Sequence, residues 1–379
     1  MQHILAIGTT CNVEKNIFTG QSVMFDGVVN KTSECGIKVS VIDISAKHGN
    51  NRIFRVLDYV VILFVLFAKL LMNKFCLAYI ITSQSKAGFY RDYLMISLCR
   101  LFNLKVVTHQ YGGNYNQMLQ VMNNSDMNRL KRMTDYISKI IVEGDYMKEQ
   151  FSFYKEYKEK VVVVPNGLPI EGKNVCKSKV YDADQPFKLF YLSNLIYSKG
   201  YFDVLKAVDL LVNKYNRNVE CVFAGKFMPA ADDVYQGISN KEDFDRFIHE
   251  KNLAKFVKYF PGLYGNEKDE MFNEANVFLL PSYYINEGQP VSIIEAMAYG
   301  CVPIVTEYCH IPMMVSNQNG CFLPPRSPES ICNSIIQLID NPKFYHGKSV
   351  KCIEDYTNKF RFEIFVTKVL NIFNAVIEK

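Results

Sequence analysis

The sequence predicts an α/β protein built from two doubly wound domains, each with a parallel sheet. The chain has 379 residues, which is enough for two domains of ordinary size. Short apolar runs alternate with longer segments of helical spacing, an order typical of parallel sheets. A polar stretch at 169–186 interrupts this alternation, and we interpret it as the linker between the domains.

The first domain is expected over residues 1–170. Strand followed by helix followed by strand implies right-handed crossovers and therefore a parallel sheet. The expected strands are 3–8, 38–44, 77–82, 105–108, 139–142 and 161–164. The expected helices are 22–35, 50–73, a segment ending at 102, 128–138 and 147–160.

The second domain is expected over residues 185–354. Its expected strands are 187–192, 220–223, 257–260, 276–280 and 301–306. Its expected helices are 201–215, 243–251, 268–274, 291–299 and 327–341. The polar segment 228–241 is expected to be a loop.

Composition narrows the protein class. The chain is 49% hydrophobic and 21% charged, which fits a globular protein and excludes a disordered one. It has 11 cysteines and no C-x-x-C pair, so we expect small core residues in a reducing compartment rather than disulfides or zinc ligands. The N-terminus has no basic segment before its first strand, so no signal peptide is expected. These features favour a cytoplasmic protein.

Charge is unevenly distributed along the chain. Residues 1–165 hold 20 Lys+Arg and 13 Asp+Glu, a balance of +7, whereas residues 166–379 hold 23 and 25, a balance of −2. No nucleic-acid recognition motif accompanies the basic half, so an anionic membrane surface is the favoured partner. The apolar run 59–72 is interrupted by Lys69 and is shorter than the roughly 20 residues that span a bilayer.

Two interpretations of the apolar segment 50–73 stay open. It is either a buried helix that covers the sheet or an interfacial helix that lies on the inner face of the plasma membrane. Two interpretations also stay open for the lysine- and aromatic-rich segment 147–160. Its lysines form a solvated face, or the segment lies against lipid.

Residues 276–306 indicate a strand, a loop, a helix, a turn and a second strand. Pro281 ends the first apolar run, Pro290 stands where the helix begins, and Gly300 follows the helix end. Ligands bind in loops at the carboxyl ends of parallel strands. The first helical turn offers the N–H groups of Val291 and Ser292 to an anion such as a diphosphate.

Two glutamates mark this segment. Glu287 lies in the loop, where a carboxylate accepts hydrogen bonds from sugar hydroxyls. Glu295 lies about one and a half turns into the helix, close enough for a ribose held over the helix N-terminus. In the structural alternative, Glu295 pairs with a lysine and Glu287 is solvated.

The segment reads Glu287-Gly-Gln-Pro-Val-Ser-Ile-Ile-Glu295-Ala-Met-Ala-Tyr-Gly-Cys-Val-Pro303. It resembles the signature of the retaining nucleotide-sugar glycosyltransferases of family four, also called glycosyl transferases group 1. The resemblance covers nearly the whole chain and is strongest from about 187 to 325. It extends to Pro165-Asn-Gly-Leu168 and to the expected strand at 319–323.

The resemblance implies the GT-B fold, in which two Rossmann-like doubly wound domains face a central cleft. The first domain binds the acceptor and is completed by a C-terminal helix at about 355–379, and the second binds the nucleotide-sugar donor. Glu287 is implied to contact the donor sugar and Glu295 the nucleotide ribose. The rest of this donor-binding segment is Gly288, Gln289, Pro290, Val291 and Ser292.

The resemblance also implies roles outside this segment. Lys199 contacts the donor diphosphate, and Asn194 stands where an arginine is common. Gly262 and Leu263 lie near the base, and Gly20 matches a glycine-rich loop that approaches the donor. In the stretch His109-Gln-Tyr-Gly-Gly-Asn114, either His109 or Tyr111 faces the donor sugar. We expect His109, with a structural role for it as the alternative, so the implied catalytic residues are His109, Glu287 and Lys199.

The implied reaction is transfer of a sugar, with retention, from a nucleotide diphosphate sugar, expected to be UDP-linked. The acceptor is a glycan or lipid-linked glycan for capsule, O-antigen or exopolysaccharide. The departing diphosphate takes the acceptor's proton, and no protein nucleophile is needed.

We expect no metal and no cofactor, because Lys199 and the helix N-terminus can neutralise the diphosphate without one. The alternatives are a GT-B nucleotide-sugar epimerase and a non-catalytic nucleotide-sugar-binding subunit of an assembly.

Overall fold

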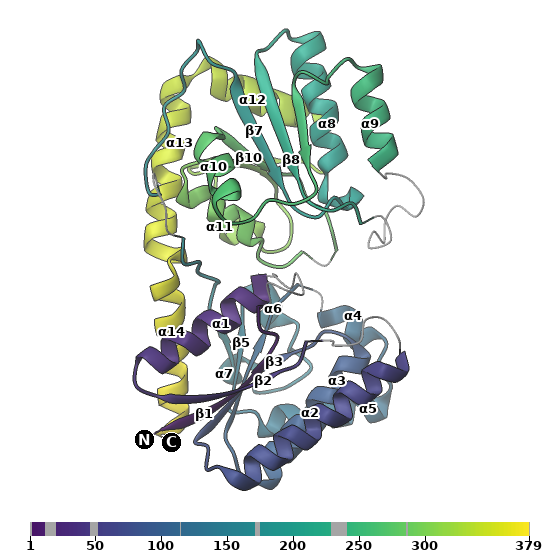
Figure 1. The fold of residues 1–379 in the computed structure, drawn as a ribbon, viewed down its shortest axis with the longest axis vertical. Coiled ribbons are helices and arrows are strands. Elements are labelled where there is room, and N and C mark those ends of the chain that lie inside the picture. Colours follow the sequence, from purple (N-terminus) through teal and green to yellow (C-terminus); the bar gives the residue numbers. More distant parts are fainter. Residues whose placement is uncertain are drawn as a thin grey trace. The chain divides into compact units, whose positions relative to one another are not determined.

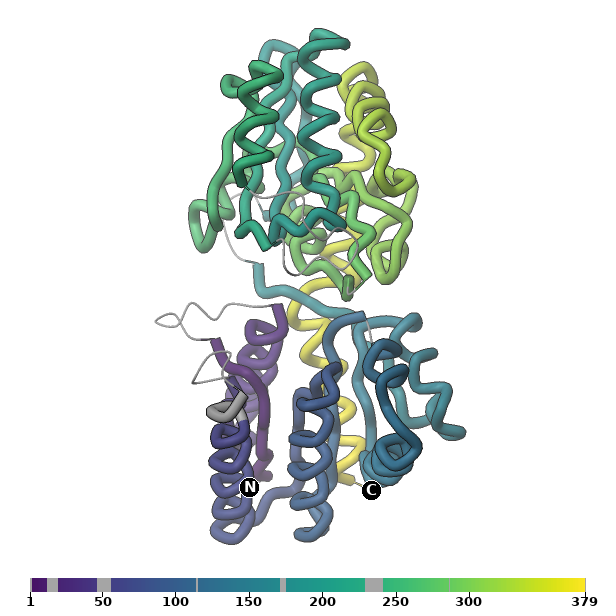
Figure 2. The backbone as a smooth tube through the Cα atoms, turned by 90° about the vertical axis from the view of Figure 1, so that its right-hand side faces the viewer, coloured from purple at the N-terminus to yellow at the C-terminus, as the bar shows by residue number. Residues whose placement is uncertain are grey.

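The chain folds into two compact units, each with its own sheet. The computed structural model describes residues 2–11, 20–45, 52–113, 115–170, 175–228, 241–285 and 287–378. The first unit comprises Met1–Gly167 and Phe362–Lys379, and the second comprises Leu168–Arg361. Both chain termini therefore belong to the first unit (Figure 2).

The first unit contains one parallel sheet of six strands in the order β2-β1-β3-β4-β5-β6. Strand β1 lies between its neighbours, with Ile4 opposite Val39 and Leu77. The chain order changes direction at β1, as in a doubly wound sheet. The strands are β1 (His3–Gly8), β2 (Lys38–Asp43), β3 (Leu77–Thr82), β4 (Val106–Gln110), β5 (Lys139–Val142) and β6 (Val161–Val163).

Helices cover both faces of this sheet (Figure 1). Helices α2, α3 and α5 share one hydrophobic core on one face, and α1 packs against α14 on the other. The helices of this unit are α1 (Gly20–Glu34), α2 (Arg52–Met72), α3 (Lys86–Leu101), α4 (Tyr115–Gln120), α5 (Asn124–Tyr136), α6 (Asp145–Glu149), α7 (Tyr157–Lys160) and α14 (Phe362–Ile377).

Side chains alternate between the two faces of the first sheet, so the first unit has two hydrophobic cores, one on each face. Successive strand residues point to opposite faces, so Ala78 joins the core under α2 and α3 while Tyr79 points toward α14. The Tyr79 ring lies 5.1 Å from the Phe373 ring, measured between centroids. Helix α14 thus closes the first sheet, although about 200 residues of the second unit separate it from β6.

The second unit repeats the architecture with six parallel strands in the order β12-β11-β10-β7-β8-β9. Helices α8 and α9 lie on one face and α10 and α11 on the other (Figure 1). The strands are β7 (Phe187–Leu192), β8 (Val219–Ala224), β9 (Val257–Phe260), β10 (Val277–Leu280), β11 (Val302–Thr306) and β12 (Cys321–Leu323).

The helices of the second unit follow its strands, and α12 packs on α8 and on α13. They are α8 (Tyr201–Asp209), α9 (Lys241–Glu250), α10 (Gly265–Glu274), α11 (Val291–Ala298), α12 (Pro328–Asp340) and α13 (Pro342–Asp355). Single 3₁₀ turns form at Tyr197–Lys199 and Ile311–Met313, and π-helical turns at Leu210–Lys214 and Tyr356–Phe360. The predicted α/β class with two doubly wound parallel sheets is confirmed.

Two expected elements of the first unit are wrong. The segment 147–160 is two short helices, α6 and α7, rather than one helix. Phe151, in the turn between them, is buried and stacks on Tyr115 with ring centroids 4.7 Å apart, which fixes this turn against α4. Strand β4 runs to Gln110, so His109 lies inside the strand instead of in the loop after it. The expected loop before Gly20 and most of the expected loop at 228–241 lie outside the described residues.

Among the described residues, none of the helices has both the length and the apolar character that crossing a membrane requires. Helix α2, which contains the apolar run 59–72, buries Ile62, Leu66 and Leu70 against the first sheet. It is therefore an integral layer of the first unit.

Removing the Phe373 side chain should destabilise the first unit. Phe373 is 1% exposed, and Phe373→Ala should cost about 3–5 kcal/mol of unfolding free energy because it leaves a cavity under α14. Native-state hydrogen exchange of the β3 amides measures this loss. Thr367→Ala, at an exposed position of the same helix, is the control. Equal protection of β3 in the two variants would contradict the role given to α14.

Candidate functional site

The loops after β7 and β10 are joined at the carboxyl edge of the second sheet. The two strands are neighbours, and the Tyr283 N–H donates a hydrogen bond to the Ser198 carbonyl over 2.7 Å. Gly200 has φ +77°, and a Cβ there would lie 2.5 Å from the Pro281 carbonyl oxygen. Only glycine allows this approach, which brings Lys199 beside the loop that carries Glu287.

Lys199 and Glu287 form an ion pair in this junction. The Lys199 Nζ lies 3.3 Å from Glu287 Oε1, and the Ser282 hydroxyl donates a 2.5 Å hydrogen bond to Glu287 Oε2. The ammonium also lies 5.4 Å from the centroid of the Tyr284 ring. Glu287 is 4% exposed, so these partners compensate for the loss of water around its charge. The pair offers one cation and one carboxylate with fixed positions.

Helix α11 begins four residues after Glu287. Pro290 is its N-cap, so the helix starts at Val291, and Gly300 follows its end with φ +67°. The N–H groups of Val291 and Ser292 belong to the first turn, where a helix provides no backbone acceptor. With the positive end of the helix dipole they form an anion-binding surface. Gly288 and Gln289 connect this turn to Glu287.

Glu295 lies on α11 one turn beyond Ser292. The Lys268 Nζ lies 2.5 Å from Glu295 Oε1, so the lysine pairing expected as the structural alternative is present. Burial raises the pKa of Glu295, and the charge of Lys268 opposes that shift. A ribose that replaced or shared the Lys268 contact would find a partly buried acceptor here. The ribose assignment stays a prediction.

The other residues predicted to bind donor in this unit lie at neighbouring strand ends. Asn194 is exposed two residues after β7. Gly262 and Leu263 follow β9 by two and three residues, and Leu263 is buried while Tyr264 beside it is exposed. Because parallel strands end at the same edge of a sheet, these positions share an edge with Lys199 and Glu287.

His109 is enclosed in the first unit. It is 0% exposed and stacks on Tyr111, with ring centroids 4.1 Å apart. Its Nδ1 is 2.8 Å from the Tyr79 hydroxyl and 3.2 Å from the Tyr111 hydroxyl. Burial lowers the pKa of His109 to about 3, so the imidazole is neutral at physiological pH. This geometry supports the structural role that the sequence left open, and a direct contact with the donor sugar stays a prediction.

The Gly112-Gly113 turn after β4 is held by side chains from three other segments. The Gly112 N–H donates to Glu143 over 3.0 Å, and the Gly112 carbonyl accepts from Gln84 over 2.5 Å. The Gly113 carbonyl accepts a 2.7 Å hydrogen bond from Gln150. Gly112 has φ +90°, a left-handed conformation that favours glycine. Gly20, the other residue of this unit predicted to bind donor, is the first residue of α1.

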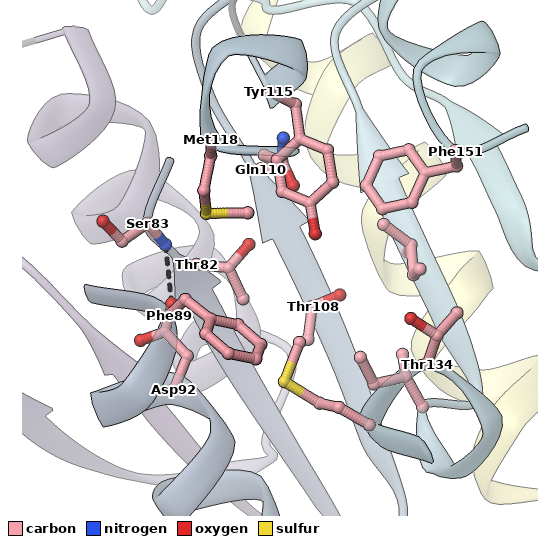
Figure 3. A pocket seen from close by; sticks show the side chains of 13 residues that line it. Thr82, Ser83, Phe89, Asp92, Thr108, Gln110, Tyr115, Met118, Thr134 and Phe151 are labelled. Carbon is pink, nitrogen blue, oxygen red and sulfur yellow. Dashed lines mark hydrogen bonds between the residues drawn. The ribbon is translucent and has the colours of Figure 1, made fainter. Parts of the chain in front are cut away.

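Figure 3 shows a small cavity in the first unit, lined by Thr82, Asp92, Thr108, Gln110 and Tyr115 among others. Its volume is about 20 Å³, which is enough for about one water molecule and far below that of a ligand pocket. Asp92 accepts the Ser83 N–H over 2.7 Å and pairs with Arg91. The cavity therefore belongs to the internal support of β3 and β4 and is too small for a nucleotide sugar.

Sequence reasoning missed the residues that position the predicted ones. They are Ser282 and Tyr284 around Glu287, Lys268 on Glu295, and Glu143, Gln84 and Gln150 around the Gly112-Gly113 turn. No motif marks them. Ser282 and Tyr284 belong to the same loop as Glu287, and the others reach their partners only through tertiary contacts. No group of three or more His, Cys, Asp or Glu side chains able to hold a metal ion was found in the part of the chain that the structure describes.

The donor-side residues of this site lie in a segment that matches a known family model. Residues 177–355 match the family model described as "Glycosyl transferases group 1". The poly(ribitol-phosphate) alpha-N-acetylglucosaminyltransferase of Staphylococcus aureus (strain COL) is 25% identical over 204 residues, which are 52% of this chain and 38% of that protein. The capsular polysaccharide biosynthesis glycosyltransferase CapH of Staphylococcus aureus is 23% identical over 240 residues, 62% of each chain.

The alignments thus span less than two thirds of either curated relative. Among solved structures, Anabaena HepE in complex with UDP matches with a TM-score of 0.70 and 12% identity, over 99% of this chain and 100% of that one. At this identity the match shows the fold, and the predicted GT-B fold is confirmed.

The buried, neutral His109 should make stability depend on pH. Its pKa is about 3 in the folded state and about 6.5 when unfolded, so its contribution is complete above pH 6.5 and is lost as pH falls toward 3. The loss should be about 1.4 kcal/mol per pH unit below 6.5. His109→Asn should flatten this slope in urea unfolding of the first unit between pH 7.5 and 5. His249→Asn, in the second unit, is the control. An unchanged slope in His109→Asn would contradict the burial of a neutral imidazole.

Proposed function

We propose that the protein transfers a sugar from a nucleotide diphosphate sugar to a glycan, because residues 177–355 match the family model described as glycosyl transferases group 1. The observation that carries this proposal is the Lys199–Glu287 pair beside the N-terminus of α11. The Lys199 ammonium and the helix N-terminus supply positive charge for a diphosphate, and the Glu287 carboxylate accepts hydrogen bonds from sugar hydroxyls. In this proposal the second unit binds the donor and the first unit binds the acceptor.

The donor is proposed to be UDP-linked. HepE, which shares the fold, was solved with UDP. Leu263, buried after β9, and the exposed ring of Tyr264 offer an apolar contact for a base. Glu295 accepts hydrogen bonds from the ribose, and the charge of Lys268 opposes the rise that burial causes in the pKa of this carboxyl.

Catalysis is proposed to rest on leaving-group stabilisation. The bond from the anomeric carbon to the diphosphate oxygen breaks while the acceptor oxygen bonds to the same face of that carbon, so configuration is retained. The acceptor proton moves to the departing diphosphate oxygen. Lys199 and the N–H groups of Val291 and Ser292 stabilise the charge that develops there, without a metal ion. Glu287 fixes the sugar for this attack, and Ser282 fixes Glu287.

The acceptor is proposed to be a glycan or lipid-linked glycan of a surface polysaccharide. One curated relative is named as a poly(ribitol-phosphate) alpha-N-acetylglucosaminyltransferase, and the other as a capsular polysaccharide biosynthesis glycosyltransferase. A nucleotide-sugar epimerase would use the same donor groups and no acceptor, so the product distinguishes the two reactions.

Substitution in the pair should abolish most transfer. Glu287→Gln and Lys199→Gln should each lower turnover about 10²- to 10³-fold, because each removes charge or orientation needed in the transition state. Transfer from UDP-sugars to a surface glycan is measured by product mass, and NMR of the product gives the anomeric configuration. Lys188→Gln, which removes a surface ion pair with Glu274 in the same unit, is the control.

Each outcome has a defined meaning. Loss of activity in both pair variants, normal activity in Lys188→Gln and a product with the donor's configuration support the proposal. Less than a tenfold effect of Lys199→Gln would remove the leaving-group role. A new free nucleotide sugar formed without acceptor would identify an epimerase.

A further inference from the structure

Helix α2 presents an apolar face outward from the first unit. Val56, Val60, Phe64, Leu71 and Met72 are all more than half exposed, with Phe64 at 71% and Met72 at 74%. The buried residues Ile62 and Leu66 lie two positions after Val60 and Phe64, about 200° around the helix. The helix is therefore apolar on both sides: one side belongs to the core and the other has no covering element among the described residues.

This face is larger than ordinary surface exposure of single hydrophobic residues. Leu57 and Val61 also lie on it and are each more than half exposed. Helix α3 packs beside α2 (Figure 1), and it also carries exposed apolar side chains, Leu94 and the 71% exposed Leu101. Contiguous apolar surface of this kind marks an interaction site.

Charge around the face is basic, because the acidic residues of α2 and α3 point inward. Asp58, the acid of α2, and Asp92, the acid of α3, are both buried. Asp126 of α5 is also buried and pairs with Lys86 and Arg129. The exposed charges of this helical layer are thus mostly cationic, and the exposed Asp135 of α5 is the exception.

A basic hollow lies in the same layer, between α3 and α5. Its volume is about 90 Å³, and it is lined by Arg100, Arg132, Ser97 and Tyr93 among others. Arg100 and Arg132 are exposed, and neither forms an ion pair with a described carboxylate. Two guanidinium groups beside hydroxyl groups are suited to a phosphate oxygen cluster.

We propose that the α2–α3–α5 layer docks on an anionic lipid surface. The apolar face of α2 inserts at the boundary between headgroups and acyl chains, and the hollow at Arg100 and Arg132 holds a lipid phosphate. A lipid surface fits better than a protein partner because the same helical layer carries a long apolar face and two exposed arginines, Arg100 and Arg132, that form no ion pair among the described residues. The docking proposal is independent of the proposed function, since it is measured without catalysis.

The test is flotation of the full-length protein with vesicles of phosphatidylcholine, with or without phosphatidylglycerol. The wild type should float with the anionic vesicles, and less with phosphatidylcholine alone or in high salt. Phe64→Glu combined with Leu71→Glu should lower the bound fraction about tenfold or more. Val180→Glu combined with Phe344→Glu, two exposed positions of the second unit, is the control and should float like the wild type.

A second variant pair tests the charge alone. Arg100→Gln combined with Arg132→Gln should weaken binding to anionic vesicles and leave binding to phosphatidylcholine unchanged. Lys255→Gln combined with Lys343→Gln, which removes the same charge from exposed positions of the second unit, should have little effect. This arm does not alter the apolar face, so it stays informative if the glutamate variant fails to fold.

Two results would overturn the proposal. One is a wild-type protein that ignores anionic vesicles at low salt. The other is a wild-type dimer, by light scattering, that becomes a monomer in Phe64→Glu/Leu71→Glu, because the face would then be covered by a second copy of the chain.

Discussion

The buried carboxylate of Glu287 is the constraint on which the candidate site depends. A charge removed from water needs fixed partners, and here they come from two loops that are far apart in the sequence. Lys199 follows β7 and Ser282 follows β10, and the two strands are neighbours in the sheet. The close approach of Gly200 to Pro281 and the Tyr283–Ser198 hydrogen bond hold the loops together. The packing that joins these two loops therefore also sets the geometry of the candidate site.

The same junction explains how a diphosphate is neutralised in the proposed reaction. Lys199 precedes Glu287 in the sequence, and the N-terminus of α11 follows it. The positions of the Lys199 ammonium and of this helix terminus are both fixed by packed elements. Groups that are fixed before a ligand binds need not reorganise as charge develops on the leaving group. The first unit contributes differently: its Gly112-Gly113 turn is fixed by Glu143, Gln84 and Gln150, which makes a rigid strand end.

The fold was predictable because each strand and helix leaves a local signal. Largely apolar runs of four to seven residues marked the strands, and Pro281, Pro290 and Gly300 marked the boundaries around α11. His109 shows the limit of such signals. Its strand extends two residues further than the apolar pattern indicates, because the neutral ring is buried against Tyr79 and Phe365. Likewise, Lys268 meets Glu295 only through tertiary packing, which no spacing reveals. The outward face of α2 has the same cause: its sequence is apolar all round, and only the fold decides which side is covered.

The proposed donor site binds a nucleoside diphosphate through protein groups alone. Calorimetric titration of the protein with UDP, GDP, ADP and CMP, in the presence and absence of EDTA, tests this property. We expect UDP to bind most tightly and EDTA to leave its affinity unchanged, and we expect Glu295→Ala to lose UDP binding while Glu274→Ala keeps it. Absence of binding by all four nucleotides, or binding of UDP that EDTA abolishes, would contradict it.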